Sequence, residues 1–366
     1  MSHHEFAAPT ARAFRNILVT GGAGFIGSNF IRYLLSQPNF NGRIINLDLL
    51  TYAGNPESLS DIQKSHGGNR YFLEKADICD RAAVEKIFSD YSIDTVVHLA
   101  AESHVDRSIH GPEAFVKTNV MGTFTLLDVA RKTWADRQDV LFHHVSTDEV
   151  YGSLGETGFF YEATPYDPRS PYSASKASSD HLAMAYLHTY GLPITLSNCS
   201  NNYGPWQFPE KLVPVMILNM LEGKPLPVYG DGRNIRDWLY VEDHNSAVWA
   251  IMQGGAAGEC FNIGGENEWE NIKLLQALID IVARLTGRPT VEFQKLISYV
   301  KDRPGHDRRY AINCDKLKSK LGWQQSVTFE QGLEQTVQWY LNNQKWIENI
   351  RSGAYREWME TNYSNR

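Results

Sequence analysis

Short apolar runs alternate with longer amphipathic stretches through the first half of this 366-residue chain. A short apolar run predicts a strand buried on both faces, and apolar residues spaced three or four apart predict a helix. The predicted strands cover residues 16–21, 43–48, 71–76, 95–100, 140–146 and 193–200. The predicted helices lie near 25–36, 55–65, 80–90, 112–134 and 172–190. This order predicts an α/β fold, with a doubly wound parallel sheet and right-handed crossovers.

The regular alternation ends near Asn201, where proline and tryptophan become frequent. We therefore expect a smaller mixed α/β lobe that binds substrate beside the domain that carries the sheet. The sheet domain is predicted at 15–200 with a return segment at 236–263, and the second lobe at 201–235 and 264–366. Two late helices, near 271–286 and 329–342, are predicted to complete that lobe.

Composition excludes several classes of protein. Asp and Glu outnumber Lys and Arg by 42 − 35 = 7, which disfavours a nucleic-acid partner. No stretch approaches the eighteen consecutive apolar residues of a membrane span, and residues 1–15 do not resemble a secretory signal. The four cysteines are far apart and are expected to be free thiols. We expect a soluble cytoplasmic protein.

Gly21, Gly24 and Gly27 are spaced as Gly-x-x-Gly-x-x-Gly between the first predicted strand and the first predicted helix, in the segment Thr20-Gly21-Gly22-Ala23-Gly24-Phe25-Ile26-Gly27. In this context such glycines allow a tight turn, a close approach of the backbone to a pyrophosphate, and close packing of the helix on the strand. The helix N-terminus would then face the phosphates. The alternative is an ordinary turn whose glycines serve only packing.

Asp48 ends the second predicted strand, twenty-one residues after Gly27. There a carboxylate can accept hydrogen bonds from a ribose diol and would repel a 2′-phosphate. The sequence therefore predicts a Rossmann domain that binds NAD in preference to NADP.

Tyr172 and Lys176 are four residues apart at the start of a predicted helix, so they share one of its faces. A tyrosine has a pKa near 10, and lowering it by about three units takes about 4 kcal/mol of preferential phenolate stabilisation. The Lys176 ammonium and a nicotinamide cation are two charges that could supply it. We expect this pair to be catalytic; the alternative is a surface helix.

Thr147, Asp148 and Glu149 follow the fifth predicted strand. Ligands of open parallel sheets bind beyond the carboxyl ends of the strands, so these side chains are expected at the site. Thr147 can bond a substrate hydroxyl, and two carboxyl groups can divide the duties of acid and base. A loop cap with solvated acids is the alternative. No acid–His or Cys–His spacing fits a metal, so none is expected.

Longer motifs give these residues a family context. The chain contains Leu50-Thr51-Tyr52-Ala53-Gly54-Asn55, Ala101-Glu102-Ser103-His104-Val105-Asp106-Arg107-Ser108, Ser146-Thr147-Asp148-Glu149-Val150-Tyr151-Gly152, Asn201-Asn202-Tyr203-Gly204-Pro205, Arg236-Asp237-Trp238-Leu239-Tyr240-Val241-Glu242-Asp243 and Asp302-Arg303-Pro304-Gly305-His306-Asp307. From about residue 16 to 342 it resembles the dTDP-glucose 4,6-dehydratases of the extended short-chain dehydrogenase/reductase superfamily. The Asp-Glu pair after the threonine is the most specific feature, because the superfamily's epimerases usually lack it.

The resemblance implies a lyase with tightly bound NAD. Tyr172 would take the proton of the sugar 4-hydroxyl while a hydride passes from carbon 4 to NAD. Glu149 would remove the proton at carbon 5, and Asp148 would protonate the departing 6-hydroxyl. Return of the hydride to carbon 6 would give dTDP-4-keto-6-deoxyglucose.

The resemblance also assigns binding residues and a dimer. Cofactor contacts would come from Gly21, Gly24, Phe25, Ile26, Gly27, Asp48, Thr51, Asp77, Ile78, Ala100, Ala101, Ser103, Thr118, Tyr172, Lys176 and Asn202. Substrate contacts would come from Ser103, Thr147, Asn201, Lys211, Leu212, Pro227, Tyr229, Arg236, Asn271, Asp302, Arg303 and His306. A homodimer would form through the helices near 112–134 and 172–190.

Charge alone also makes Lys211, Arg236 and Arg303 candidate partners of a diphosphate. Two alternatives remain: an epimerase or decarboxylase of the same superfamily acting on a UDP sugar, and a non-catalytic NAD-binding regulator. Only the resemblance favours thymidine over uridine as the base of the nucleotide.

Overall fold

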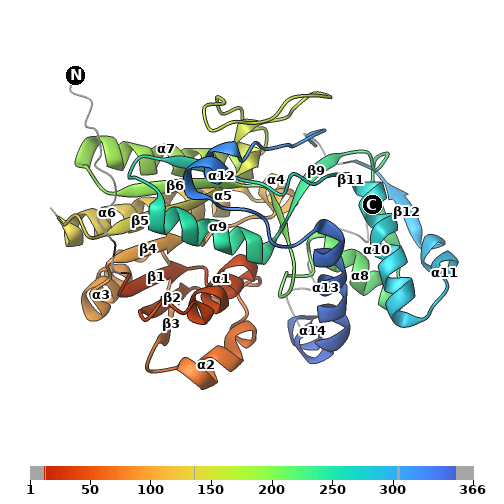
Figure 1. Ribbon diagram of the computed structural model, residues 1–366, viewed down its shortest axis with the longest axis horizontal. Helices are drawn as coiled ribbons and strands as arrows, with labels where there is room; N and C mark the ends of the chain where they lie inside the picture. Colours follow the sequence, from red (N-terminus) through yellow and green to blue (C-terminus); the bar gives the residue numbers. More distant parts are fainter. Residues whose placement is uncertain (1–11, 13, 136, 303–305, 352–366) are drawn as a thin grey trace.

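Seven parallel strands form the central sheet of the computed structural model, which describes residues 12, 14–135, 137–302 and 306–351 (Figure 1). The strand order is β10-β6-β5-β4-β1-β2-β3. The strands are β1 Asn16–Thr20, β2 Arg43–Asp48, β3 Tyr71–Lys75, β4 Thr95–His98, β5 Leu141–Thr147, β6 Ile194–Cys199 and β10 Cys260–Ile263. The six strands predicted from the sequence are confirmed, and their ends agree within two residues. The order reverses between β1 and β4, where such folds bind dinucleotides.

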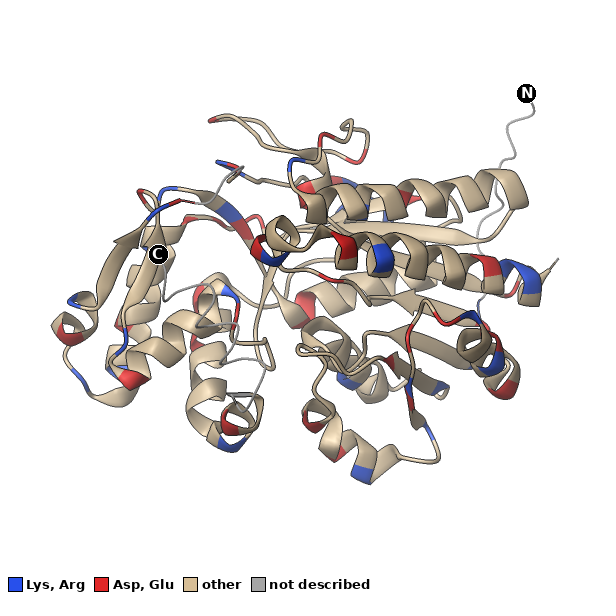
Figure 2. Cartoon of the chain, turned by 180° about the vertical axis from the view of Figure 1, so that it is seen from behind, with Lys and Arg blue, Asp and Glu red and all other residues tan. Residues whose placement is uncertain are grey.

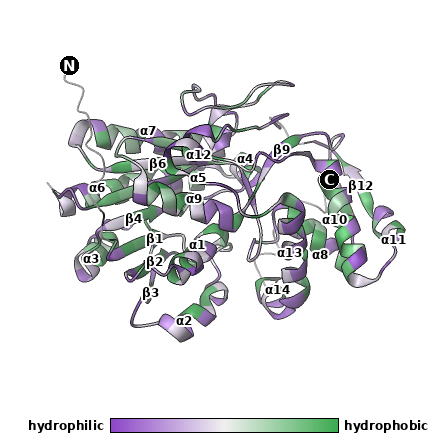
Figure 3. Cartoon of the chain, viewed as in Figure 1, coloured by the Kyte–Doolittle hydropathy of each residue, from purple (hydrophilic) through white to green (hydrophobic). Residues whose placement is uncertain are grey.

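Helices cover both faces of this sheet (Figure 1). One face packs against α3 Arg81–Tyr91, α6 Thr123–Trp134 and α7 Pro171–Tyr190. The other face packs against α1 Phe25–Ser36, α9 Val241–Gly254 and α12 Asp315–Leu321. Burial on both faces explains why the strands are apolar almost throughout, and Figure 3 shows hydrophobic residues along them. The predicted doubly wound α/β fold is confirmed.

Two predicted helices are less regular than the sequence pattern indicates. The segment near 55–65 is a 3₁₀ turn at Pro56–Leu59 followed by α2 Ser60–His66. The segment near 112–134 is α5 Pro112–Phe115, a π-helical stretch at Val116–Gly122, and α6. A short helix that was not predicted, α4 Val105–His110, precedes α5. Periodicity identifies helical segments but does not resolve such changes of pitch.

The remaining elements build a second hydrophobic core beside the sheet. A three-stranded sheet contains β7 Asn201–Tyr203, β9 Ile235–Tyr240 and β11 Glu268–Glu270, and a two-stranded parallel sheet contains β8 Leu226–Tyr229 and β12 Ile297–Val300. The helices are α8 Leu212–Glu222, α10 Asn271–Thr286, α11 Thr290–Gln294, α13 Phe329–Asn342 and α14 Gln344–Arg351. The late helices predicted at 271–286 and 329–342 are confirmed.

The predicted return segment, 236–263, is shared between the sheets. Strand β10 pairs with β6 in the central sheet, while β9 pairs with β7 and β11. Helix α9 lies between them in sequence and packs against α1. The division of the chain into two domains at the stated boundaries stays a prediction.

A cluster of tryptophans joins α13 and α14 to the domain that carries the central sheet. The ring of Trp206 lies 4.7 Å from that of Trp339 and 5.7 Å from that of Trp346, between ring centroids. The Arg32 guanidinium lies 4.6 Å from the Trp206 ring centre, and Trp346 Nε1 donates to Ser58 Oγ at 3.0 Å. These contacts fix the position of the segment after Trp206, which continues into the site described below.

The surface and the cysteines complete the description. Figure 2 shows Lys, Arg, Asp and Glu mainly on helices and loops, with both signs interspersed. All four cysteines are free. Within the described ranges, none of the helices has the length and apolar character needed to cross a bilayer.

Candidate active site

A cavity of 410 Å³ lies at the carboxyl ends of the central strands. Its walls come from residues at or just after the ends of β1 to β6, and from the second half of the chain, where Gln207, Phe208, Glu210, Lys211 and Leu212 line it. Every residue predicted to contact the cofactor lines this cavity. Among the residues predicted to contact substrate, Ser103, Thr147, Asn201, Lys211 and Leu212 line it as well.

The glycine turn is shaped by close backbone contacts. Gly21 has a φ of +70°, and a Cβ there would lie 2.7 Å from Ala100 Cα. A Cβ on Gly27 would lie 2.3 Å from the carbonyl oxygen of Gly21. Helix α1 begins at Phe25 with Gly24 as its N-cap, and no side chain caps it. The helix N-terminus is therefore open to an anion in the cavity, which fits a bound pyrophosphate.

Asp48 ends β2 at the cavity wall and is 8% exposed. Its Oδ2 accepts a hydrogen bond from the Ala23 N–H at 2.9 Å, and its Oδ1 accepts one from the Leu50 N–H at 2.8 Å. Burial raises the pKa of this carboxyl, and the two backbone bonds oppose that rise. A carboxylate accepts about four hydrogen bonds, so Asp48 retains capacity for a ribose diol.

Tyr172 and Lys176 lie on the first turns of α7, as predicted, and both line the cavity. A capping box between Ser170 and Ser173 fixes the start of this helix. The Lys176 ammonium is buried and donates to the carbonyl oxygen of Val145 in β5 at 2.8 Å. Helix α7 is thereby tied to the strand that directly precedes the two acids.

The sequence argument named the Lys176 ammonium and a nicotinamide cation together as charges that could lower the pKa of Tyr172, and this stays a prediction. Burial raises the pKa of Tyr172 well above its usual value, and the charge of Glu149 raises it further. A hydrogen bond with the Thr147 side chain acts in the opposite direction. Thr147 is thus the described residue that favours the phenolate, while the Lys176 ammonium points to a backbone carbonyl.

Asp148 and Glu149 open a 3₁₀ turn, Asp148–Tyr151, directly after β5. Thr147 caps this turn, because its Oγ1 accepts from the Glu149 N–H at 3.3 Å. Glu149 lines the cavity, whereas Asp148 is 2% exposed and is not among the residues that line it. Burial raises the pKa of Asp148 well above its usual value, and the nearby Glu149 and Asp237 raise it further. The two acids therefore occupy different environments, and burial of Asp148 favours its protonated form.

The remaining predicted substrate residues lie outside the cavity lining. Arg236 is buried, donates to the Asp307 carbonyl oxygen at 3.0 Å, and lies 4.3 Å from the centre of the Tyr310 ring. Pro227, Tyr229, Asn271, Asp302 and His306 also lie in the second half of the chain, and Arg303 falls outside the described residues. Tyr229 lies 6.3 Å from His306 between ring centroids. The structure therefore does not place these residues on the cavity wall with Lys211.

Several cavity residues were missed by sequence reasoning, and Glu210 is the most prominent. It is 5% exposed, and burial raises its pKa to about 7. Arg107 lies 3.6 Å from its carboxylate and Lys211 follows it directly, and both charges lower the pKa. The signal in the sequence was that Glu210 directly precedes Lys211, a residue predicted to contact substrate. The other missed lining residues include Leu49, Glu102, Cys199, Ser200, Gln207, Phe208 and Trp238.

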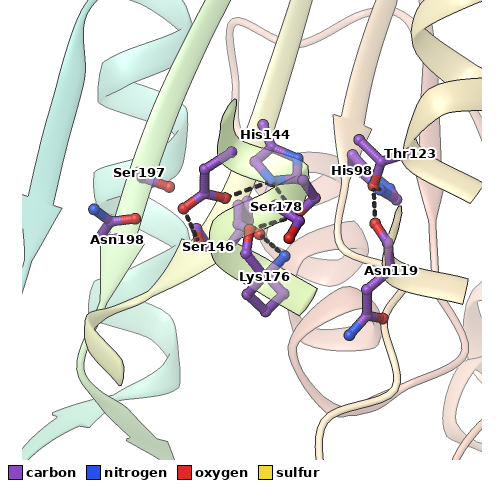
Figure 4. Close-up of polar contacts among 12 residues, drawn as sticks. His98, Asn119, Thr123, His144, Ser146, Lys176, Ser178, Ser197 and Asn198 are labelled. Atoms are coloured by element: carbon purple, nitrogen blue, oxygen red, sulfur yellow. Dashed lines mark hydrogen bonds and ion pairs between the residues drawn. The ribbon is translucent and has the colours of Figure 1, made fainter. Parts of the chain in front are cut away.

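The histidines of the central strands have partners of their own (Figure 4). His98 lies 2.8 Å from the hydroxyls of both Thr20 and Thr123. His143 bonds Thr195 and Ser197, and His144 bonds Asp180 on the other face of β5. Over the described part of the chain, no group of three or more His, Cys, Asp or Glu side chains could hold a metal ion.

Comparisons with protein families and with individual proteins point to the same family. The family model described as GDP-mannose 4,6 dehydratase matches residues 18–336. The dTDP-glucose 4,6-dehydratase of Salmonella typhimurium is 54% identical over 364 residues, which cover 96% of this chain and 99% of that protein. The chain belongs to the dTDP-glucose 4,6-dehydratase family. The dTDP-glucose 4,6-dehydratase 1 of Escherichia coli is 52% identical with the same coverage.

Solved structures agree with this family. The dTDP-glucose 4,6-dehydratase of Bacillus anthracis in complex with NAD has a TM-score of 0.81 at 46% identity, covering 92% of this chain and 99% of that one. The Streptomyces venezuelae enzyme with NAD and TYD bound has a TM-score of 0.84 at 43% identity, with the same coverage. A UDP-glucose 4-epimerase from Thermotoga maritima is more distant, with a TM-score of 0.79 at 31% identity over 90% of this chain and 99% of that one.

Proposed function

We propose that this chain is an NAD-dependent hydro-lyase that converts dTDP-glucose to dTDP-4-keto-6-deoxyglucose. The observation that carries the proposal is that Glu149 lines the same cavity as Tyr172 and Lys176, while the adjacent acid Asp148 is buried and has a raised pKa. Membership of the dTDP-glucose 4,6-dehydratase family supports the same reaction. A simple hydride transfer needs no second acid, whereas elimination of water needs both an acid and a base.

The cofactor would be held by the glycine turn, by Asp48, and by the residues after β3, β4 and β6 that line the cavity. When bound, NAD supplies the acceptor and later the donor of the hydride, and its oxidised ring supplies a positive charge. Asp48 favours NAD over NADP because its charge repels a 2′-phosphate.

Tyr172 is proposed as the base that takes the proton of the 4-hydroxyl, with Thr147 bonding the same oxygen. Thr147 Oγ1 bonds the phenol side chain and the Glu149 N–H, so it links the oxidation and elimination parts of the site. Lys176 is proposed to supply a positive charge to the cavity that it lines, and its bond to the Val145 carbonyl ties α7 to β5.

Glu149 is proposed as the base that removes the proton from carbon 5, because it is the acid of the pair that lines the cavity. Asp148 is proposed as the acid that protonates the departing 6-hydroxyl. Its raised pKa favours the protonated form, which a general acid requires. Lys211 and Arg236 are proposed to bind the diphosphate, with Ser103, Asn201 and Asn271 as polar partners of the substrate.

Deuterium at carbon 4 of dTDP-glucose is expected to appear at carbon 6 of the product. The physical reason is that one cofactor, retained in the cavity, accepts and returns the same hydride. Proton magnetic resonance and mass spectrometry of the product measure the position and content of the label. A matched incubation of unlabelled substrate in deuterated water should place solvent deuterium at carbon 5.

Loss of the carbon-4 label to water would contradict an enclosed transfer. An epimer in place of the 4-keto sugar would instead favour the epimerase reading. Absence of both products in a protein that binds NAD would favour the regulator.

We further propose a homodimer formed through the helices near 112–134 and 172–190, which are α5, the π-helical stretch Val116–Gly122, α6 and α7. Apolar side chains on and beside these helices are exposed, namely Ile109, Val116, Met121 and Tyr190. Sedimentation equilibrium is expected to give about twice the chain mass of 41.5 kDa, and Val116→Asp with Met121→Asp is expected to give the monomer. A wild-type chain that sediments as a monomer at micromolar concentration would reject the dimer.

The four free thiols also support a reducing, cytoplasmic location.

A further inference from the structure

Asp180 is a buried carboxylate to which the proposed reaction assigns no role. It lies on α7, one turn after Lys176, and is 2% exposed. Its Oδ1 accepts from His144 Nε2 at 2.9 Å, and its Oδ2 accepts from Ser146 Oγ at 2.7 Å and Tyr166 Oη at 3.0 Å. A buried carboxylate with three donors is held in one position, because each lost bond would leave a buried polar group unpaired.

The partners of Asp180 tie α7 to β5 at two neighbouring points. His144 and Ser146 are two residues apart in β5, so both side chains point to the face that α7 covers. Between them, the Val145 carbonyl accepts from Lys176 Nζ. Figure 4 shows His144, Ser146 and Lys176 gathered at this junction. Lys176 and Asp180 together thus fix the register of the helix that carries Tyr172 against the strand that ends at Thr147, two residues before Glu149.

The charges around Lys176 give Asp180 a second effect. Burial lowers the pKa of Lys176, whereas Asp180 on the same helix and Cys199 on β6 raise it. The Lys176 ammonium in turn lowers the pKa of His98 in β4 and His144 in β5. Burial lowers the pKa of both histidines, and it raises the pKa of the Cys199 thiol to about 12, so these three groups are neutral near pH 7. Among these groups, Asp180 is left as the counter-charge of the buried ammonium.

We propose that Asp180 is a positioning residue for Lys176, which locks α7 on β5 and balances the ammonium charge at the base of the cavity. This inference rests on the proposed function, because its kinetic consequence appears in the oxidation of the sugar. The neighbouring tyrosine, Tyr172, depends on the same helix register.

The test replaces the charge and keeps the shape. In Asp180→Asn, His144 can carry its proton on Nδ1, which lacks a hydrogen-bond partner in the described structure, and Nε2 can then accept from the new amide. Removing the negative charge lowers the pKa of Lys176, so the ammonium is lost at a lower pH. The measurement is the rate of NADH formation in a single turnover as a function of pH. We expect the pH at which this rate falls on the alkaline side to be lower by about one unit in Asp180→Asn.

A second readout does not depend on activity. In protein labelled with carbon-13 lysine, the resonance that disappears in Lys176→Arg reports the titration of Lys176. In Asp180→Asn this titration is expected to move down by the same amount. A role in stability alone would lower activity at every pH and leave both the alkaline fall in rate and the titration in place.

Asp243→Asn is the matched control. Asp243 is also 2% exposed, and its carboxylate accepts from the Ser326 N–H, the Ser326 hydroxyl and the Val327 N–H. Asp243→Asn should lower the stability of the protein without changing the pH at which NADH formation falls on the alkaline side. If Asp180→Asn does not fold, the pair His144→Gln with Asp180→Asn keeps an amide–amide bond between β5 and α7 while removing the charge, and the same shift is expected.

The outcomes separate the two proposals. A wild-type chain that makes no 4-keto sugar overturns the proposed function, and the lysine titration still tests Asp180. An active wild type whose alkaline fall in rate and lysine titration are unchanged in the folded Asp180 variants overturns the positioning role and leaves the proposed function intact.

Discussion

Glu149→Gln is expected to stop the reaction after oxidation, so that NADH accumulates on the protein while product formation falls by about 10²–10⁴-fold. The amide keeps the size of the side chain but cannot accept the proton of carbon 5. Tyr172, Thr147 and Lys176 remain in place on α7 and β5, so the sugar can still be oxidised. The near-ultraviolet absorbance of NADH and the alkali absorbance of the 4-keto product, followed in one reaction, measure the two steps.

Glu156→Gln is the matched control for this prediction. Glu156 is an exposed glutamate in the loop that follows the 3₁₀ turn. Its replacement should leave both signals at the wild-type level. Normal elimination in Glu149→Gln would show that another group is the base, and Glu210, with its pKa raised to about 7, would be the next candidate.

The central sheet could be predicted from the sequence because its strands are buried on both faces. Such strands are short, apolar and bounded by polar turns, so the sequence defines both their existence and their ends. The glycines add the connection between β1 and α1, where backbone contacts exclude a Cβ. The pairing of β9 with β7 and β11 could not be predicted, because these short strands are defined by partners distant in sequence.

The residues of the candidate site also differ in how far the sequence predicts their positions. Side chains that follow a strand, such as Asp48, Thr147 and Glu149, could be placed because parallel strands end at one edge. Glu210 was missed because residues 207–212 follow no regular element of the central sheet. The environment of Tyr172 was also inaccessible, since the contact of Lys176 with the Val145 carbonyl depends on how α7 packs on β5.

Tyr172→Phe is expected to stop the reaction before oxidation, so that neither NADH nor product forms above about one part in 10²–10⁴ of the wild-type rate. Phenylalanine keeps the ring in its buried position and removes only the oxygen that accepts the proton of the 4-hydroxyl. Loss of the bond with Thr147 leaves that hydroxyl with its contact to the Glu149 N–H. The same two absorbance signals measure the result, with substrate binding followed by equilibrium dialysis.

Tyr161→Phe, at an exposed tyrosine, should leave both signals unchanged. The double variant Tyr172→Phe with Glu149→Gln gives the decisive comparison, because the order of the steps fixes its phenotype. If Tyr172 acts first, the double variant must behave as Tyr172→Phe alone and accumulate no NADH. Accumulation of NADH in the double variant would mean that a group other than Tyr172 takes the first proton, and the assignment of the tyrosine would fail while that of Glu149 stood.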